Sequence, residues 1–210
     1  GAPIVGTDAD VPAQTLTYAI VGGNTGEMFS IDAASGQLRV HTGAMLDFET
    51  QATYRLLVEA TDDGTGKMST TGTVTVSIMN VNEPPVFAEQ EWQLTVAENA
   101  GSGALVGFQL NASDPDTGSV LSYSIVPVTQ ATGTIGELDW LLFDLNKATG
   151  QLSLRAGVTL DFETRPTLNF AVQVTDNSAE QAVATAEVTV HVIDVNEAPS
   201  ILPGQVRNVY

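Results

Sequence analysis

Apolar and polar residues alternate along short stretches of the chain, as they do in β-strands. Within residues 73–81, Val74, Val76 and Ile78 alternate with threonine and serine, and residues 187–195 repeat this period of two with valine. No stretch shows a long helical period, and Gly, Asn and Asp separate the short runs. Short antiparallel strands at this density predict an all-β fold of β-sandwiches of about 100 residues each.

One sequence unit occurs twice in the chain. The segment "FSIDAASGQLRV" at 29–40 matches "FDLNKATGQLSL" at 143–154, a separation of 114 positions. Nearer the N-terminus the separation is only 105 positions, between Tyr18 and Tyr123, because the second copy carries an insertion near 129–140. Several matching blocks in the same order predict two tandem copies of one domain.

The two copies begin at different points of the unit. The second copy opens with the strand-like segment "EWQLTV", whereas the first copy lacks this segment and opens at its second strand. We therefore predict a repeat truncated at its first strand at 1–83, a repeat with an insertion at 84–197, and a linker with the first strand of a third repeat at 198–210. The chain reads as a piece of a longer protein.

Composition narrows the classes of function. Asp and Glu number 25 against seven Lys and Arg, which gives a formal net charge of −18. Such a chain is a poor nucleic-acid binder, because phosphate contacts need clustered Lys and Arg. The absence of cysteine excludes disulfides, thiolate metal sites and cysteine nucleophiles. No apolar run of 18 residues occurs, so we expect no membrane insertion by this fragment.

Carboxylates recur at fixed positions between the predicted strands. Both copies contain a "DxD" element, an "LDFE" element and a "TD" element, followed by a linker of the form "VNExP". Ca²⁺ takes six to eight oxygen ligands and needs no nitrogen or sulfur donor. Repeated acidic loops of this kind favour a calcium site over the alternative interpretation, a solvated acidic surface.

These elements resemble the cadherin repeat family in its bacterial form. The resemblance is carried by "AEN" at 97–99, by "DAD" and "DPD", by the two "LDFE" segments and by the linkers "NVNEPP" and "DVNEAP". It implies tandem seven-strand Greek-key β-sandwiches, of the cadherin or immunoglobulin-like type, joined end to end with Ca²⁺ at each junction.

The resemblance also implies a ligand set for two or three Ca²⁺ ions. The junction between the copies would use Asp47, Glu49, Val81, Asn82, Glu83, Pro84, Asp114, Asp116 and Asp176, with Val81 and Pro84 contributing backbone carbonyls. Incomplete half-sites that bind Ca²⁺ poorly would comprise Glu98, Asp161, Glu163, Asp194, Asn196 and Glu197 at one end, and Asp8, Asp10 and Asp62 at the other. The first copy has no counterpart of Glu98, and this departure lowers the expected ion count.

The function that the resemblance implies is calcium-dependent adhesion at a cell surface. The fragment would belong to a larger secreted or membrane-anchored extracellular protein, and would contact other cadherin-like repeats, a surface protein or a polysaccharide. Two alternatives stay open: a passive spacer within a giant adhesin, or a carbohydrate-binding module that uses Trp140. Residues 200–210 could also enter the open sheet edge of a second molecule by strand exchange.

No enzyme is predicted. His41 and His191 fall on outward strand faces and are isolated, so no nucleophilic triad can be assembled. The pair Asp47 and Glu49 resembles a glycosidase pair, but its repetition in the second copy favours a structural role. We expect Trp92 in a core; Trp140 either packs on its sandwich or is displayed to a partner.

Overall fold

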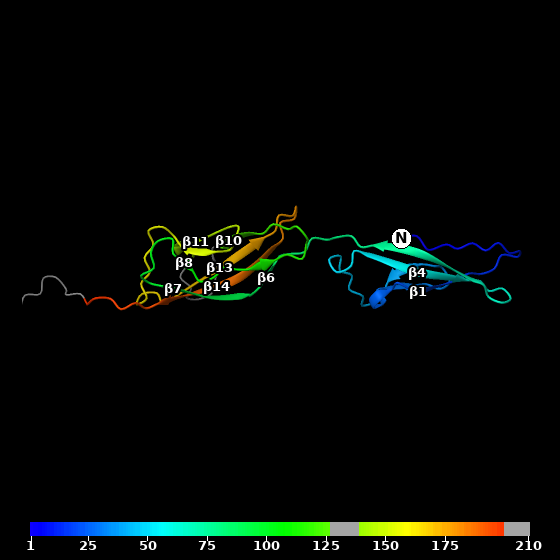
Figure 1. Ribbon diagram of the computed structural model, residues 1–210, viewed down its shortest axis with the longest axis horizontal. Helices are drawn as coiled ribbons and strands as arrows, with labels where there is room; N and C mark the ends of the chain where they lie inside the picture. The colour runs from blue at the N-terminus through cyan, green and yellow to red at the C-terminus, as the bar shows by residue number, and fades with distance from the viewer. Residues whose placement is uncertain (127–138, 200–210) are drawn as a thin grey trace, which may run out of the picture. The chain divides into compact units, whose positions relative to one another are not determined.

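A computed structural model of the protein describes residues 1–126 and 139–199. The chain forms two compact units, unit 1 at Gly1–Val81 and unit 2 from Asn82 onward (Figure 1). Helical structure in the described residues is confined to the 3₁₀ turns η1 (Thr25–Glu27) and η2 (Asp139–Leu142). No helix of the described part is long and apolar enough to cross a membrane. The predicted all-β class is confirmed.

Unit 1 contains one three-stranded sheet and a short ribbon. The sheet has the order β1-β4-β5 and is antiparallel throughout, with β1 at Thr17–Gly22, β4 at Thr53–Thr61 and β5 at Ser69–Ser77. The ribbon pairs β2 (Phe29–Ile31) with β3 (Leu38–Val40). Among the described residues of unit 1, no strand pairs with the outer edge of β5.

Unit 2 contains the same elements and several more. Its larger sheet has the order β10-β13-β14-β7, with β10 at Ser122–Val126, β13 at Thr167–Thr175, β14 at Val183–Ile193 and β7 at Glu91–Ala97. A second sheet joins β11 (Phe143–Leu145), β12 (Leu152–Leu154) and β8 (Leu105–Val106). A further short pair joins β6 (Val86–Phe87) to β9 (Ala112–Ser113). The strand β7 runs parallel to β14, and the other pairs are antiparallel.

The alternation in sequence corresponds to alternation in burial. On β7, Trp92, Leu94 and Val96 are at most 5% exposed, while the residues between them are exposed. They pair in register with the buried valines of β14, which confirms the core position predicted for Trp92. Both histidines are exposed, also as predicted. Removing these apolar faces from water is the main stabilising contribution to each unit.

The two units repeat the same contact between a tyrosine hydroxyl and the backbone. The phenol oxygen of Tyr18 accepts a hydrogen bond from the N–H of Gly6 at 2.8 Å, and that of Tyr123 accepts one from the N–H of Ala112 at 3.1 Å. Each bond fixes the chain just before a DxD element. The internal duplication therefore extends to individual hydrogen bonds.

The turn between the paired short strands requires glycine in both units. Gly36 and Gly150 have φ values of 69° and 68°, where only glycine is unstrained. A Cβ atom at Gly36 would lie 2.2 Å from the carbonyl oxygen of Ile4, and one at Gly150 would lie 2.4 Å from that of Leu110. The glycines of the "SGQL" and "TGQL" segments thus permit the backbone at Ile4 and at Leu110 to pass directly over this turn.

Candidate metal centre

The "LDFET" segments fold into turns that their own aspartates close. Asp47 accepts hydrogen bonds from the backbone N–H and the hydroxyl of Thr50, both at 2.9 Å. Asp161 accepts the same pair from Thr164, at 3.0 and 2.8 Å. These bonds hold the pKa of both carboxyl groups below its ordinary value. Each aspartate therefore has a structural role that sequence reasoning missed, although the threonine three positions later was a usable signal.

The DxD elements are also locally ordered. Asp8 accepts a hydrogen bond from the N–H of Asp10 at 2.8 Å, and Asp114 accepts one from the N–H of Asp116 at 2.9 Å. Such Asx turns hold two carboxylates on one short loop. In unit 1, Asp8 and Asp62 line a common hollow of about 210 Å³.

Unit 2 brings the start of its chain to its own acidic loops. The Asn82 side-chain amide donates to the carboxylate of Asp176 at 2.8 Å, and the Glu83 N–H donates to the carboxylate of Asp116 at 2.9 Å. Asp176 is 4% exposed, and the amide of Asn82 is the main cause of its lowered pKa. Four of the predicted junction ligands are thereby connected within one unit.

An orphaned oxygen lies in the same region. Asp114 Oδ2 is buried and has no hydrogen-bond partner among the described residues. A buried carboxylate oxygen without a partner is costly unless an opposite charge compensates it. A donor set of carboxylate and amide oxygens on short loops suits a hard divalent cation such as Ca²⁺. The residues of unit 2 therefore fit the group that the sequence predicted.

A second acidic cluster surrounds Glu98 at the end of β7. One Glu98 carboxylate oxygen accepts from the N–H of Phe162 at 2.8 Å, and the other accepts from the N–H of Val195 at 2.6 Å. The side chain is 8% exposed, and these two bonds lower its pKa. Glu98 is thus held ionised and in a fixed orientation, and neither backbone donor was apparent from sequence.

Four further acids surround Glu98. Carboxylate oxygens of Glu98, Asp161 and Glu163 lie within 4.8 Å of one another, and those of Glu98, Asp194 and Glu197 form a second such group. The hydrogen bond to Glu98 raises the pKa of Glu197, which means that a proton reduces the repulsion. Among the described residues no Lys or Arg forms an ion pair with any of the five. A divalent cation would supply the missing positive charge.

Other predicted ligands are not assembled by these contacts. Asp47, Glu49 and Val81 belong to unit 1, and their part in the junction stays a prediction. Asp62 accepts hydrogen bonds from the N–H groups of Gly64 and Met68, which order its loop. Pro84 and Asn196 likewise stay predicted ligands.

The insertion contributes a structural anchor. Asp139 is 3% exposed, forms an ion pair with Arg165 and accepts a hydrogen bond from the N–H of Asn169 at 2.9 Å. Trp140 is half-buried and packs against the core of unit 2. Of the two interpretations left open for this tryptophan, the structure favours packing on the sandwich. The rest of the insertion lies outside the described residues.

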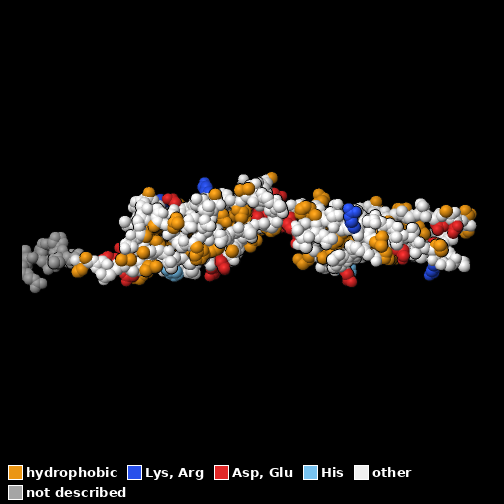
Figure 2. Space-filling model, viewed as in Figure 1, with side chains coloured by type: hydrophobic (Ala, Val, Ile, Leu, Met, Phe, Trp, Pro, Cys, Tyr) orange, Lys and Arg blue, Asp and Glu red, His pale blue; other side chains and the backbone are white. Residues whose placement is uncertain are grey.

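Acidic side chains are spread over the surface and basic ones are few. On the face drawn in Figure 2, Asp and Glu occur on both units, and only isolated Lys or Arg side chains are visible. The two ion pairs between described side chains join Arg155 to Asp144 and Arg165 to Asp139. The clusters above are therefore set in a surface of one predominant charge, which attracts cations.

Comparison with known proteins shows the family. A model of the cadherin domain matches residues 2–79 and 93–193. The chain is 37% identical over 188 residues to protein dachsous of Drosophila melanogaster, covering 87% of this chain and 5% of that protein. It is 34% identical over 199 residues to cadherin EGF LAG seven-pass G-type receptor 3 of Mus musculus, covering 92% of this chain and 6% of that protein.

Solved structures of cadherin domains are similar to this chain. Protocadherin gamma B2 extracellular cadherin domains 3–6 superpose with a TM-score of 0.66 at 26% identity, over 92% of this chain and 44% of that one. The chain thus spans a small part of its curated relatives and under half of this structure. The relatives named here are animal proteins, so the bacterial character predicted from the sequence is not supported.

Proposed function

Because the chain belongs to the cadherin family, we propose that it is a calcium-dependent adhesion module in the extracellular part of a larger cell-surface protein. Cadherin domains generally mediate calcium-dependent cell adhesion through contacts with other cadherins. The buried Asp114 oxygen that has no hydrogen-bond partner among the described residues carries the proposal for this chain. The five grouped acids around Glu98, without a basic partner in the described part of the chain, support it.

The proposed junction between the two repeats uses the corresponding positions. Asp47 and Glu49 of unit 1 and Asn82 and Glu83 of the linker would act with the acidic loops of unit 2. These loops contribute Asp114, Asp116 and Asp176. The buried, unpartnered oxygen of Asp114 supports this assignment. Two or three Ca²⁺ ions are proposed, because the first repeat has no counterpart of Glu98.

Mutual repulsion gives the proposed junction its mechanical role. Without a cation, the grouped carboxylates repel one another, and the short linker "VNEPP" is free to bend. With Ca²⁺ held between the repeats, the charges are neutralised and the linker is cross-linked. An ion that binds only this ordered state stabilises it by mass action. The resulting stiffness would let the parent protein present an adhesive surface at a distance.

Calorimetric titration of the chelator-treated chain with Ca²⁺ tests the proposal. We expect saturable binding that weakens strongly in Asp116→Asn, and no change in Asp144→Asn, whose carboxylate lies outside the clusters. Small-angle scattering should show a narrower distribution of chain dimensions with Ca²⁺ than with chelator. Absence of saturable heat, together with identical scattering, would contradict the calcium clamp.

The alternative functions predict different binding results. A passive spacer would stay monomeric with Ca²⁺ in ultracentrifugation, whereas homophilic adhesion predicts calcium-dependent self-association. Among the described residues no contact favours carbohydrate binding, because Trp140 packs against the core of unit 2. Glycan binding that is lost in Trp140→Ala would restore that alternative. Strand exchange through 200–210 concerns residues outside the described part of the chain.

A further inference from the structure

The chain contains one segment of the form Asn-x-Ser or Asn-x-Thr, which is "NAS" at 111–113. Each other asparagine lacks serine or threonine two positions later, and the middle residue here is alanine rather than proline. This pattern is the acceptor for N-linked glycosylation of secreted proteins. A three-residue pattern also arises by chance, so its place in the fold decides whether it can carry a sugar.

The polar side chains of this segment face solvent together. Ala112 of β9 pairs with the buried Phe87 of β6, and it packs against the core of unit 2. Side chains alternate between the two faces of a strand, so Asn111 and Ser113 lie on the face opposite Ala112. Both are exposed. The acceptor amide and the hydroxyl that the pattern requires are therefore on one accessible face.

The fold holds the backbone around Asn111 by hydrogen bonds on both sides. The carbonyl oxygen of Asn111 accepts from the N–H of Ala88 at 2.9 Å, and the N–H of Ala112 donates to the hydroxyl of Tyr123 at 3.1 Å. No hydrogen bond joins the side chain of Asn111 or of Ser113 to another described residue. A sugar attached to Asn111 would therefore displace none of these contacts.

An exposed apolar side chain lies beside the acceptor. Val86 of β6 is 51% exposed and pairs with Ser113. The same antiparallel register places Ala88 opposite Asn111, and residues directly opposite one another share a face. A bulky, hydrophilic oligosaccharide on Asn111 would cover this face of the β6–β9 pair.

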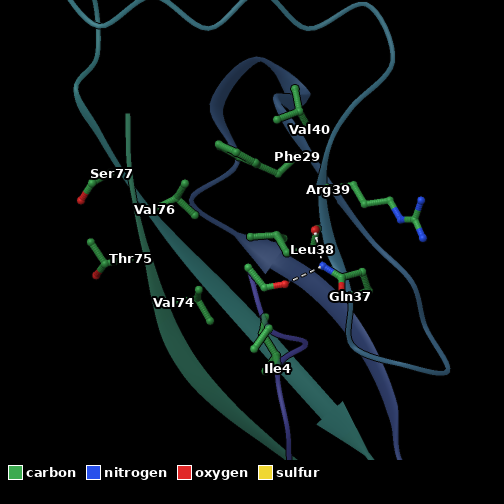
Figure 3. Close-up of a pocket in the computed structure, with 12 residues that line it drawn as sticks. Ile4, Phe29, Gln37, Leu38, Arg39, Val40, Val74, Thr75, Val76 and Ser77 are labelled. Atoms are coloured by element: carbon green, nitrogen blue, oxygen red, sulfur yellow. Dashed lines mark hydrogen bonds between the residues drawn. The ribbon is translucent and has the colours of Figure 1, made fainter. Parts of the chain in front are cut away.

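The first repeat shows the same alternation without the acceptor. The counterpart of the buried Leu110 is Ile4, which lines an apolar hollow together with Leu38 and Val74 (Figure 3). The next residue, Val5, occupies the position of Asn111 and is 79% exposed. The equivalent position therefore faces outward in both units, and the second repeat carries asparagine there.

We propose that Asn111 is a site of N-linked glycosylation, and this assignment rests on the extracellular location proposed above. In the reaction, the amide nitrogen of Asn111 forms a bond to the anomeric carbon of an oligosaccharide that is carried on a lipid pyrophosphate. The bond from that carbon to the pyrophosphate breaks, the lipid pyrophosphate leaves, and the amide loses one proton. The product is a glycan on the β6–β9 face of unit 2, three positions before Asp114 of the DxD element.

Secretion of the full chain from cultured animal cells, behind a cleavable signal peptide, provides the test. We expect a chain that is heavier than its sequence mass and that loses the excess on treatment with peptide N-glycosidase. This enzyme leaves an aspartate in place of the modified asparagine, so peptide mass spectrometry locates the site. A secreted chain in which Asn111 is unmodified would overturn the proposal.

Matched variants of the chain test the pattern itself. Ser113→Ala keeps Asn111 but removes the required hydroxyl, and this variant should carry no glycan. Ser113→Thr is the control, because it preserves the pattern and should stay glycosylated. Val5→Asn completes the pattern with Gly6 and Thr7 at the equivalent exposed position of unit 1, and it should add a second glycan. A glycan at position 5 alone, with Asn111 bare in the same molecule, would overturn the proposal, since the transferase had then reached the chain.

Calcium titration separates this site from the proposed function. Asn111→Gln should bind Ca²⁺ with unchanged affinity, because Asn111 is none of the predicted ligands. A bare Asn111 in a secreted chain that binds Ca²⁺ would overturn the glycosylation site alone. A glycosylated chain without saturable calcium binding would overturn the calcium-dependent module and leave the glycosylation site standing.

Discussion

Glu98 and Val195 are 97 positions apart, and the Val195 N–H donates to the Glu98 carboxylate over 2.6 Å. The other oxygen of Glu98 accepts from the N–H of Phe162, so one side chain connects the end of β7 to two acidic segments. A charge-assisted bond of this kind is stronger than one between neutral groups. The orientation of the whole cluster therefore depends on Glu98, whose charged side chain accepts both of these backbone hydrogen bonds.

Glu98→Gln should weaken calcium binding by this cluster. The amide removes one negative charge and directs a donor toward a backbone N–H, so the loops around it lose a fixed point. We expect calcium affinity to fall by roughly 10-fold or more, as it does when an orienting group is lost. Calorimetry measures this. Glu91→Gln, at an exposed position of β7, is the control, and equal losses in both variants would contradict the role of Glu98.

The stabilising effect of calcium should depend on pH. The Glu98 hydrogen bond raises the pKa of Glu197. A raised pKa means that the contribution of Glu197 to stability is present at low pH and is lost as the pH rises through its folded value. Ca²⁺ would replace this proton, so the rise in Tm on adding Ca²⁺ should be larger at about pH 7 than at about pH 4.

Thermal unfolding with and without Ca²⁺ at both pH values measures the effect. Protons should also be released on binding at a pH where Glu197 is partly protonated, and calorimetry in buffers of different ionisation enthalpy detects this release. Glu197→Gln should release fewer protons than the unmodified chain. The same calcium-induced shift at both pH values would be inconsistent with competition between proton and cation.

The ion pair between Asp139 and Arg165 should contribute more to the free energy of unfolding than the exposed pair between Asp144 and Arg155. Asp139→Asn removes a charge that is 3% exposed and paired with Arg165. The side chain of Arg165 is 40% exposed, which reduces the loss, and we expect about 1–3 kcal/mol of destabilisation. Asp144→Asn breaks the exposed pair with Arg155 and should cost under about 1 kcal/mol. Denaturant unfolding ranks the two, and a larger loss for Asp144→Asn would refute this account.

The two units should unfold separately in chelator. Leu56 is fully buried in unit 1, and Leu152 is fully buried in unit 2. Either leucine-to-alanine substitution should cost about 2–5 kcal/mol, because each leaves a cavity. Scanning calorimetry should show that Leu56→Ala lowers one transition and Leu152→Ala lowers the other. A single transition that both variants shift equally would mean that the units unfold together.

The sequence predicted those features that repeat. Alternation in 73–81 and 187–195 located strands, and the core position expected for Trp92 is confirmed. The duplication and the ordered acidic motifs then identified the family. The resemblance to that family implied that Glu98 would lie near Asp161 and Asp194, and their carboxylate oxygens do group with that of Glu98. The acidic motifs between the strands occur in both copies, whereas Trp92 and Glu98 belong to a segment that the first copy lacks.

Features that depend on tertiary contact were not predictable in this way. Val74 and Val188 occupy equivalent positions in their repeats, but within the described residues only Val188 pairs with a strand of the β7 kind. The buried environment of Asp139 arises from Arg165 and the N–H of Asn169, which no local periodicity indicates. Burial and pairing of this kind are set by residues distant in sequence, whereas alternation reports only on the strand itself.

The repeated tyrosine and glycine contacts also show where this domain can accept inserted residues. The two tyrosines are 105 positions apart and the two glycines 114, yet both pairs make the same bonds to the preceding segment. The extra residues of the second copy therefore lie, in sequence, between two contacts that both copies keep. An epitope grafted into the matching stretch of the first copy should therefore keep Gly23, where a Cβ atom would lie 1.9 Å from the carbonyl oxygen of Arg55, and Asn24, whose side chain bonds the backbone of Phe29.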